Sequence, residues 1–572
     1  MSRQTSSAFK LRICFTTGAI VLCIILMFLV FSRRNEPSSG LLSLDSGIYS
    51  SKTLKITVRA PQGCTISYTT DGSYPHAEQT TGRNKIILRL SRSMSGTLVS
   101  HAEEMAYPSK FVMHDSDTLP YGVVLRVAVI DQEGNVQEQK TAVYLFGEKL
   151  HERWANCLIV SLALDPADLL DYERGILVKG AIYDRWKETK YAKEILNTIN
   201  EWEIESNISQ HGRAWERPAL MQIYDPGAVV PSVEAPCGVR VQGNSSRVFS
   251  QRSFNLYFRK EYGVTSLDYY LFDHVGKYES FTLRNGGNDT NYLKFKDTLL
   301  QSLLRDRDFV IQSSRPAILF LNGEYWGPYC LNEIISDRFI QEHYGIDADN
   351  VVLFKDGALE DGTDSDQLLY DELLSFVKKD LSVSENYNAF CQMMDVQSMA
   401  DYCAAQIYIG NADWKLGRNE ALWRLRDRSF NEGRWKYILY DTEFSSGLYD
   451  SADTSVDRNH FQLALENHPL FASAMQNPSF QSLFLNALHT IGMQNLSYDQ
   501  VCDTLDSYEA QWKPLMQDYY LRFGNYSFFW ENNLQTIRLF FRNRYEIIIP
   551  MVEKYLTAIQ ILPNSIGTLS SS

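Results

Sequence analysis

The hydrophobic pattern of this chain changes twice, and these changes limit the folds it can adopt. Residues 47–147 contain short segments in which apolar and polar residues alternate, as in "TLKITVRA", and turn residues separate these segments. From Trp154 strand and helix patterns mix, and beyond about Asn467 apolar residues recur at helical spacing. Alternation is typical of strands and helical spacing of amphipathic helices. We therefore expect an α+β chain that begins with a small all-β sandwich and ends in a helical part.

Length and composition limit the classes of function. A chain of 572 residues predicts two to four domains, and 44% hydrophobic residues are enough to build their cores. The net charge of −14 argues against a nucleic-acid partner, because phosphate binding needs a basic surface. No C-x-x-C pair occurs among the nine cysteines, which argues against a structural zinc site. We expect most cysteines to be small buried residues, with one or two disulfides left open.

An uncharged apolar run lies near the N-terminus, from Cys14 to Phe31, with basic residues on both sides. Its length is sufficient to span a bilayer. We expect residues 1–34 to be a cytoplasmic tail and a transmembrane signal anchor, with the bulk of the chain extracellular, followed by a linker at 35–46. The alternative is a cleaved signal peptide, which would make the protein secreted.

Two stretches present oxygen ligands. "GNADWKLGRNEALWRLRD" carries Asp413 and Asn419 after a predicted helix, and "GRWKYILYDTEFSSG" carries Asp441 and Glu443 at the end of a predicted strand. Carboxylates and amides bind magnesium, and phosphoryl transfer needs such a metal together with a carboxylate near the incoming hydroxyl. From the residues alone, a site for a metal and a phosphate, a sugar site or a solvated surface all remain open.

Three further residues are candidates for binding a nucleotide. Arg252 lies on the strand after a Gly/Ser-rich turn at 243–246, which offers backbone N–H groups, and Glu333 on a later hairpin is a candidate partner for Arg252. Trp435 precedes Asp441 by six residues, and it would either stack on a base or fill the core.

The first β-rich region carries a resemblance of its own. "GIYSSKTLKITVRAPQGCTISYTTDGSYP" contains a Tyr-Thr-x-Asp-Gly-Ser-x-Pro stretch from Tyr68 to Pro75, which we read as a hairpin. This stretch resembles the chitobiase/β-hexosaminidase C-terminal-type β-sandwich module. The resemblance implies that residues 47–147 form a spacer or a carbohydrate-binding appendage, with a cell-wall or surface polysaccharide as a possible partner.

The remaining sequence resembles the spore coat protein H (CotH) kinase family. Seven segments follow the family's order: "IVSLALDPADLLDYERGILVKG", "WERPALMQIYDP", "VQGNSSRVFSQRSFNLYFRKEYG", "LRNGGND", "FLNGEYWGPYCLNE", "IGNADWKLGRNEALWR" and "WKYILYDTEF". The similarity covers residues 155–561 and leaves 562–572 as a tail. It implies an atypical protein-kinase-like, two-lobed domain that uses ATP and Mg²⁺ to phosphorylate Ser or Thr of a protein, often outside the cytoplasm.

The resemblance also implies roles for individual residues. Asp413 matches the catalytic-loop Asp, which orients or deprotonates the acceptor hydroxyl. Asn419 and Asp441 match metal ligands, and Glu443 stands where the family has a second Asp. Glu333 matches the acid that tethers the phosphate-binding cation.

Two departures from the family pattern leave a second reading open. Arg252 stands where many members have the phosphate-binding Lys, and the two side chains are not interchangeable at a tight site. Glu443 is one methylene longer than the family's Asp. The alternative to a working kinase is therefore a catalytically weak or inactive pseudokinase that acts as a surface binding or structural protein.

A glycoside hydrolase would need two acids across an aromatic-lined groove, and the motif order does not favour it.

Overall fold

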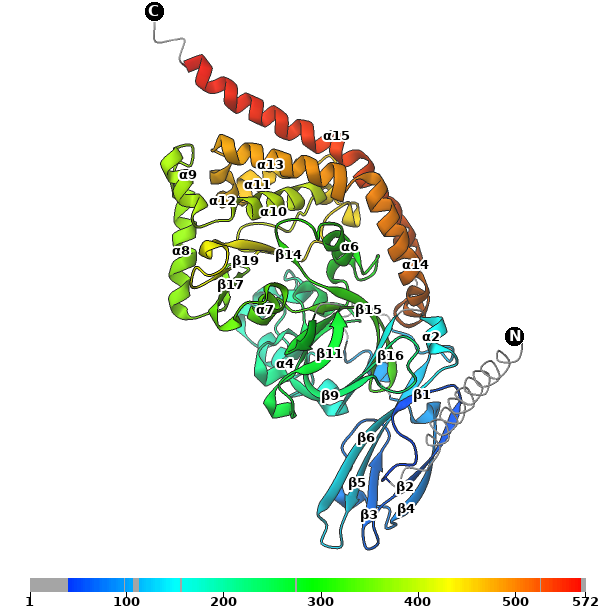
Figure 1. The fold of residues 1–572 in the computed structure, drawn as a ribbon. Coiled ribbons are helices and arrows are strands. Elements are labelled where there is room, and N and C mark those ends of the chain that lie inside the picture. The colour runs from blue at the N-terminus through cyan, green and yellow to red at the C-terminus, as the bar shows by residue number, and fades with distance from the viewer. Residues whose placement is uncertain are drawn as a thin grey trace, which may run out of the picture.

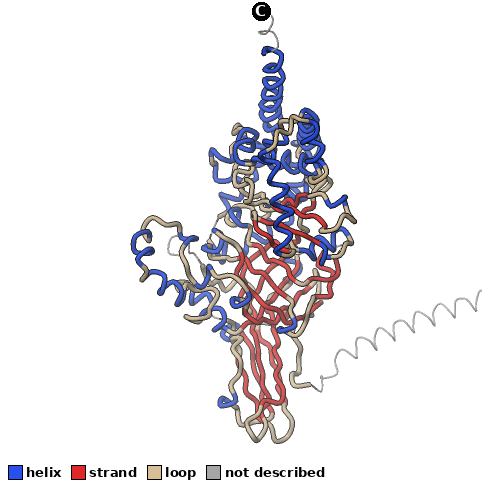
Figure 2. Tube along the Cα trace, turned by 90° about the vertical axis from the view of Figure 1, so that its left-hand side faces the viewer, coloured by secondary structure: helices blue, strands red, loops and turns tan. Residues whose placement is uncertain are grey.

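The computed structural model describes residues 40–96, 98–105, 113–154, 157–272, 275–524 and 526–566. The predicted anchor at 14–31 lies outside these residues. Within the described ranges, no helix is both long and apolar enough to cross a membrane. Strands occupy one end and the centre of the molecule, and helices gather at the other end (Figures 1 and 2).

The N-terminal part consists of two β-layers around an apolar core. Its strands are β1 (Gly47–Tyr49), β2 (Thr53–Arg59), β3 (Thr65–Thr69), β4 (Lys85–Ser91), β5 (Tyr121–Ile130) and β6 (Val136–Phe146). β2 pairs with β4 alone, whereas β1, β6, β5 and β3 belong to the second layer. Ile56 and Val58 from the first layer pack with Val123 and Val127 from the second, and all four are fully buried. The expectation of a separate sandwich domain at 47–147 stays a prediction.

The second layer does not end with the sandwich. β5 also pairs with β16 through Tyr121 and Glu324, and β16 belongs to a ring of seven strands in the order β16-β13-β10-β9-β8-β7-β15, which closes because β15 pairs with β16. These strands are β7 (Leu158–Leu164), β8 (Arg217–Tyr224), β9 (Val233–Gln242), β10 (Ser253–Tyr257), β13 (Ser280–Arg284), β15 (Ser314–Leu321) and β16 (Glu324–Glu333). We call this ring the central sheet.

Short elements surround the central sheet. They are the helices α2 (Leu150–Arg153), α3 (Pro166–Leu170), α4 (Gly180–Lys187), α5 (Lys190–Ile195) and α6 (Lys296–Leu303), and the strand pair β11 (Leu267–Phe272) and β12 (Val275–Tyr278).

A second lobe contains a smaller sheet and most of the helices. The sheet has the order β14-β20-β19-β17-β18, and its strands are β14 (Val310–Ile311), β17 (Val351–Lys355), β18 (Ala358–Asp361), β19 (Ala421–Leu425) and β20 (Lys436–Leu439). The helices are α7 (Asp337–Tyr344), α8 (Gln367–Ser375), α9 (Ser384–Cys391), α10 (Val396–Ile409), α11 (His460–Asn467), α12 (Pro469–Ala474), α13 (Pro478–Thr490), α14 (Tyr498–Phe523) and α15 (Ser527–Ile566). The mixed α+β class and the helical C-terminal part are thus confirmed.

Local predictions had different outcomes. The later hairpin, which carries Glu333, is present: it turns at Asn322 and Gly323, and both residues adopt the positive φ that such a tight turn needs. The hairpin predicted at Tyr68–Pro75 is wrong, because β3 pairs with β5 rather than with the strand that follows it. The Asp71 carboxylate accepts a hydrogen bond from the Ser73 backbone nitrogen at 3.0 Å, so the segment forms a local turn.

The cysteines of the described residues carry no disulfide. All seven that lie beyond the apolar run are free, and Cys157, Cys237, Cys330 and Cys403 are buried. The expectation of small buried cysteines therefore holds for these four.

Candidate functional site

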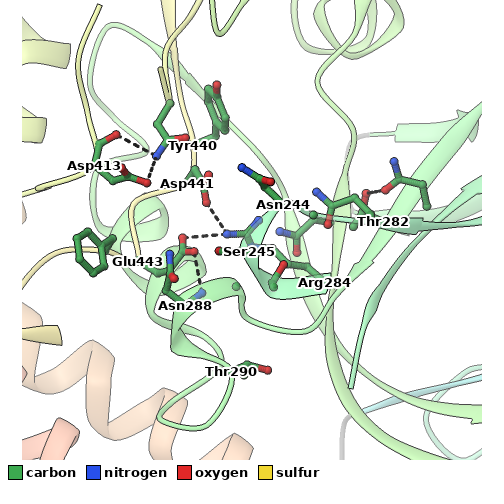
Figure 3. Close-up of a pocket in the computed structure, with 18 of the residues that line it drawn as sticks. Asn244, Ser245, Thr282, Arg284, Asn288, Thr290, Asp413, Tyr440, Asp441 and Glu443 are labelled. Atoms are coloured by element: carbon green, nitrogen blue, oxygen red, sulfur yellow. Dashed lines mark hydrogen bonds and ion pairs between the residues drawn. The ribbon is translucent and has the colours of Figure 1, made fainter. Parts of the chain in front are cut away.

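A cleft of about 1170 Å³ lies between the central sheet and the second lobe. The central sheet contributes residues of β9, β10, β13 and β16, and the second lobe contributes the loops after α10 and β20. The cleft is lined by Asp413, Asn419, Asp441 and Glu443, which are the four oxygen-bearing residues expected to act together. Figure 3 shows three of them, Asp413, Asp441 and Glu443, around one space.

Arg284 joins the two acids that follow β20. Its Nη2 lies 2.6 Å from Asp441 Oδ1 and 2.8 Å from Glu443 Oε2 (Figure 3). A third carboxylate, Asp297, lies 3.8 Å from Arg284 Nε. The Asn288 backbone nitrogen donates to Glu443 Oε1 at 3.2 Å. The acids at the end of β20 therefore converge on a positive charge supplied by the end of β13.

The two acids differ in protonation. Burial raises the pKa of Glu443 well above its usual range, and the nearby charge of Asp441 adds to this effect although Arg284 opposes it. Burial also acts on Asp441, but Arg284 and a hydrogen bond from Glu443 outweigh it and hold the pKa of Asp441 below its ordinary value. Asp441 is therefore the stronger acid of the pair and Glu443 the weaker one.

The loop after α10 positions the third acid. α10 ends at Gly410, whose φ of 70° is the left-handed conformation typical of a helix C-terminus. Asn411 Oδ1 then accepts a hydrogen bond from the Asp413 backbone nitrogen at 3.0 Å. The Asp413 carboxylate forms an ion pair with Arg418 and accepts a hydrogen bond from Asn419 Nδ2 at 3.2 Å. Burial raises the pKa of Asp413, while the charge of Arg418 lowers it in part.

A buried contact between His468 and Glu420 fixes the far end of this loop. His468 Nε2 lies 2.6 Å from Glu420 Oε1, and both side chains are almost fully buried. The other oxygen of Glu420 accepts a hydrogen bond from the Gly417 backbone nitrogen at 2.9 Å. Trp414 packs on His468 with ring centroids 4.9 Å apart. The loop that carries Asp413 is therefore attached to the helical part at several points.

Backbone strain gathers at the same place. Asp356, Asn419 and Asp441 all have φ between 51° and 57°, which residues with a Cβ rarely adopt. Asp356 Oδ1 accepts hydrogen bonds from the Asn419 backbone nitrogen and from Tyr440 Oη, both at 2.7 Å. Such strained residues cluster at functional sites, where the surrounding structure holds them in place. Asp356 thus links the loop of Asn419 to the segment of Asp441.

Glu333 also lines the cleft, but the structure does not bring it to Arg252. Glu333 on β16 pairs with Phe281 on β13, and Phe281 pairs with Leu256 on β10. Leu256 is four residues beyond Arg252 in the chain. At about 3.3 Å per residue, this offset separates the two backbones by roughly 13 Å along the strands. The Glu333 carboxylate accepts a hydrogen bond from the Ser313 backbone nitrogen at 2.7 Å and contacts His343 at 3.0 Å.

The nucleotide-binding roles predicted for Arg252 and Trp435 do not fit the structure. Neither residue is among the described residues that line the cleft. The Arg252 guanidinium is buried and donates to the backbone oxygens of Arg247 and Met105. Trp435 is fully buried in the core of the second lobe, where the centroid of its ring lies 5.8 Å from that of Phe354. The core alternative is therefore the correct reading of Trp435.

Sequence reasoning missed the cations that do line the cleft. They are Arg240, Arg284, Lys355 and Arg418. Arg284 lies in "LRNGGND", a segment that supported the family resemblance without receiving a role, and its position at the end of a strand was the available signal. The Gly/Ser-rich turn at 243–246 does line the cleft, as its composition suggested.

The donor set fits a magnesium ion that takes further ligands from a bound phosphate. Asn419 uses its amide nitrogen on Asp413, which leaves its oxygen for a ligand, and Asp441 and Glu443 supply carboxylates that already converge on a cation. No group of three or more His, Cys, Asp or Glu side chains suited to a metal occurs in the described part of the chain. Magnesium commonly uses only one or two carboxylates and completes its shell with water and phosphate oxygens.

Comparison with known sequences adds independent information. A family model described as CotH kinase protein matches residues 239–548, which is more than half of the 572-residue chain. The matched segment contains all the cleft residues named above, from Arg240 to Asp441 and Glu443. No curated protein sequence matches the chain.

Proposed function

The chain belongs to the CotH kinase protein family, and from this premise we propose that it is an atypical kinase that transfers the γ-phosphate of ATP to a Ser or Thr hydroxyl of a protein. The observation that carries the proposal is the convergence of Asp413, Asn419, Asp441 and Glu443 on one cleft from separate elements of the second lobe. Phosphoryl transfer depends mainly on position and electrostatics, so a site of this kind has the parts it needs.

Asp413 acts on the acceptor. Its carboxylate is held by Arg418 and Asn419, and burial raises its pKa, which improves its capacity to take a proton. The acceptor oxygen forms a bond to the γ-phosphorus, the bond from that phosphorus to the ADP oxygen breaks, and the hydroxyl proton passes to Asp413. Asn411 keeps the Asp413 backbone in place during this step.

Asp441, Glu443 and the Asn419 oxygen would hold Mg²⁺, which would supply positive charge to neutralise the phosphates. The acids are pre-aligned by Arg284, which bonds to both carboxylates. We assign to Arg284, rather than to Arg252, the fixed positive charge beside the phosphates. Lys355 is a second cation on the cleft wall, and its Nζ lies 5.2 Å from the centre of the Tyr440 ring.

The location and the N-terminal part complete the proposal. Surface anchoring rests on the apolar run at 14–31 and its basic flanks. The sandwich in residues 47–147 acts as a spacer or holds a surface polysaccharide, in line with the chitobiase-like sequence at Tyr68–Pro75. The domain division at 47–147 and 155–561 belongs to the same proposal.

The test is transfer of labelled γ-phosphate from ATP, with and without Mg²⁺, to generic Ser/Thr acceptors. The parent chain should transfer phosphate only with Mg²⁺, and Asp413→Ala and Asp441→Ala should abolish transfer while the protein remains folded by circular dichroism. Transfer that both variants retain would exclude the proposed site.

The second candidate function is a pseudokinase that binds a partner without catalysis. Two observations favour it: Arg252 bonds to backbone oxygens away from the cleft, and the Arg284 guanidinium lies where a metal would meet Asp441 and Glu443. A folded parent chain that binds ATP but transfers no phosphate to any acceptor would support this alternative.

A further inference from the structure

A continuous row of aromatic rings leads from the cleft to the protein surface. The row runs from Phe444 through Tyr449, Tyr292 and Phe529 to Phe528. The centroids of neighbouring rings in this order are 5.9, 5.2, 5.4 and 5.8 Å apart. The first three residues line the cleft. We call these five residues the aromatic ridge.

The ridge is built from three distant parts of the sequence, which hold it rigid. Phe444 and Tyr449 follow β20, Tyr292 lies in the loop before α6, and Phe528 and Phe529 form the first turn of α15. Tyr449 Oη donates to the Asn288 backbone oxygen at 2.7 Å. The chain at Gly447 passes so close to Thr536 of α15 that a Cβ at Gly447 would lie 2.4 Å from Thr536 Cγ2. The ridge is therefore a preformed surface.

The outer end of the ridge is exposed to solvent although its side chains are apolar. Phe528 is 74% exposed, Phe529 41% and Tyr449 42%. Large aromatic rings bury 150–250 Å² when they pack, so these three present on the order of 300 Å² of mostly apolar surface. A patch of this size reaches the range of the largest apolar patches on ordinary monomers, and such patches are often functional.

The ridge begins beside the group that receives the acceptor proton. The Phe444 backbone oxygen accepts a hydrogen bond at 3.1 Å from the backbone nitrogen of Ala412, the residue before Asp413. A hydroxyl that reaches Asp413 therefore arrives next to Phe444. A polypeptide that carries this hydroxyl can leave the cleft along the ridge.

The end of the cleft away from the ridge also carries apolar side chains. β13 runs between the two ends of the cleft. At its first end Phe281 pairs with Glu333, which is followed by Ile334 and Ile335. At its second end Arg284 leads on to Asn288 and Tyr292. Ile334 and Ile335 line the first end of the cleft. The ridge is thus left for the acceptor rather than for the base.

We propose that the aromatic ridge binds the acceptor polypeptide through an apolar side chain near the Ser or Thr that is phosphorylated. This proposal rests on the proposed kinase function and adds a specificity determinant to it. The four ring separations together span roughly seven residues of extended chain at about 3.3 Å each, so the apolar side chain lies within about seven residues of the hydroxyl. Apolar contact, rather than charge, then selects the acceptor.

The experiment compares two twelve-residue peptides with the full chain in lipid nanodiscs. Both peptides carry one central Ser in a Gly/Asn background, which holds no other hydroxyl, and one of them also carries Phe four residues from the Ser on either side. Fluorescence polarisation gives Kd for each peptide with the parent, Phe528→Ser and Phe529→Ser. Leu539→Ser is the matched control, because Leu539 is 55% exposed on the same helix and lies outside the ridge.

We expect the Phe peptide to bind about tenfold more tightly than the Gly/Asn peptide. Phe528→Ser and Phe529→Ser should remove most of this preference, and Leu539→Ser should leave it unchanged. Since Phe528 is 74% exposed, its replacement should not affect folding. Equal Kd values for the two peptides, or a preference that survives in both ridge variants, would overturn the proposal.

Phosphate transfer, measured in parallel, separates this proposal from the kinase function. A Phe preference that depends on the ridge, without phosphate transfer, supports the ridge and contradicts the kinase. Transfer to both peptides with the same KM in the parent and in Phe528→Ser supports the kinase and contradicts the ridge.

Discussion

Arg284 at the end of β13 lies within hydrogen-bonding distance of Asp441 at the end of β20, with Nη2 and Oδ1 2.6 Å apart. The side chain of Arg284 is 16% exposed and that of Asp441 31% exposed, so the pair is only partly in contact with water. The same Nη2 also bonds to Glu443. This contact joins the central sheet to the second lobe at the point where the cleft holds its acids. Its strength therefore affects both the stability of the fold and the electrostatics of the site.

We expect Arg284→Ala to reduce the turnover number of phosphate transfer by about 10²–10³-fold, because a fixed charge beside the phosphates is lost. The free energy of unfolding should fall by about 3 kcal/mol, because two buried acids lose their cation. Arg284→Lys should restore part of the activity, since it keeps the charge but bonds to the acids less well. Transfer kinetics and urea unfolding measure the two effects.

The control for this prediction is Arg259→Ala. Arg259 bonds to both oxygens of the buried Glu216 at 3.0 Å, and it is not among the described residues that line the cleft. The loss of Arg259 should lower the free energy of unfolding about as much as the loss of Arg284 does. The turnover number, measured on folded protein, should not change. An equal loss of turnover in both variants would mean that Arg284 acts only through stability.

Asp413→Asn should lower the turnover number by about 10²–10⁴-fold, because an amide cannot take the hydroxyl proton. The affinity for ATP should stay nearly constant, since Asp413 faces the acceptor rather than the nucleotide. Asp450→Asn is the control, because Asp450 is an exposed acid near the same mouth of the cleft. Transfer kinetics together with equilibrium nucleotide binding check this prediction, and a large fall in ATP affinity would contradict it.

Stability should fall in acid because of Asp366. A hydrogen bond from Arg426, assisted by those from Thr363, lowers the pKa of Asp366 to about 2. An acid whose pKa is lower in the folded state than in the unfolded state adds stability above its unfolded pKa, near 4, and this contribution is lost as the pH falls towards 2. The Arg426 side chain is 36% exposed, so we expect about 1 kcal/mol after screening by water.

Arg426→Gln should flatten this part of the pH profile. The free energy of unfolding, measured between pH 6 and 2.5 with the parent and the variant, gives the difference directly. Parallel pH profiles for the two proteins would exclude the Arg426 pair as the cause.

Features of the fold that depend on near neighbours could be predicted from the sequence. The turn at Asn322 and Gly323 and the strands on either side of it follow from turn chemistry and alternation. The pairing of β3 with β5, and of β5 with β16, depends on residues more than fifty positions apart, and local patterns hold no information on such partners. The wrong hairpin at Tyr68–Pro75 has this cause, because a real local turn was assigned to the wrong strand partner.

In the candidate site, too, the local features could be predicted from the sequence and the long-range contacts could not. Asp413, Asn419, Asp441 and Glu443 lie in two short segments whose residue types already indicated oxygen ligands, and they line one cleft. The partner of Asp441 is 157 residues away in the sequence, so Arg284 could be assigned only in three dimensions. Arg252 was chosen because its position in "QRS" matches a family lysine, yet the sequence does not show which way its side chain points.

The orientation of Arg252 leads to a prediction opposite to that of the sequence. On family grounds, Arg252→Lys would restore the usual phosphate-binding lysine and raise activity. In the structure Arg252 Nε donates to the Arg247 backbone oxygen at 2.7 Å, and Arg252 Nη2 donates to the Met105 backbone oxygen. The ammonium group of a lysine cannot reproduce this planar arrangement of two donors. We expect Arg252→Lys to lower the free energy of unfolding by about 1–3 kcal/mol, because a buried carbonyl loses its donor. The turnover number of phosphate transfer should not increase. Thermal unfolding and transfer kinetics test both statements, and a variant that is as stable as the parent and more active would show that the side chain reaches the phosphates after all.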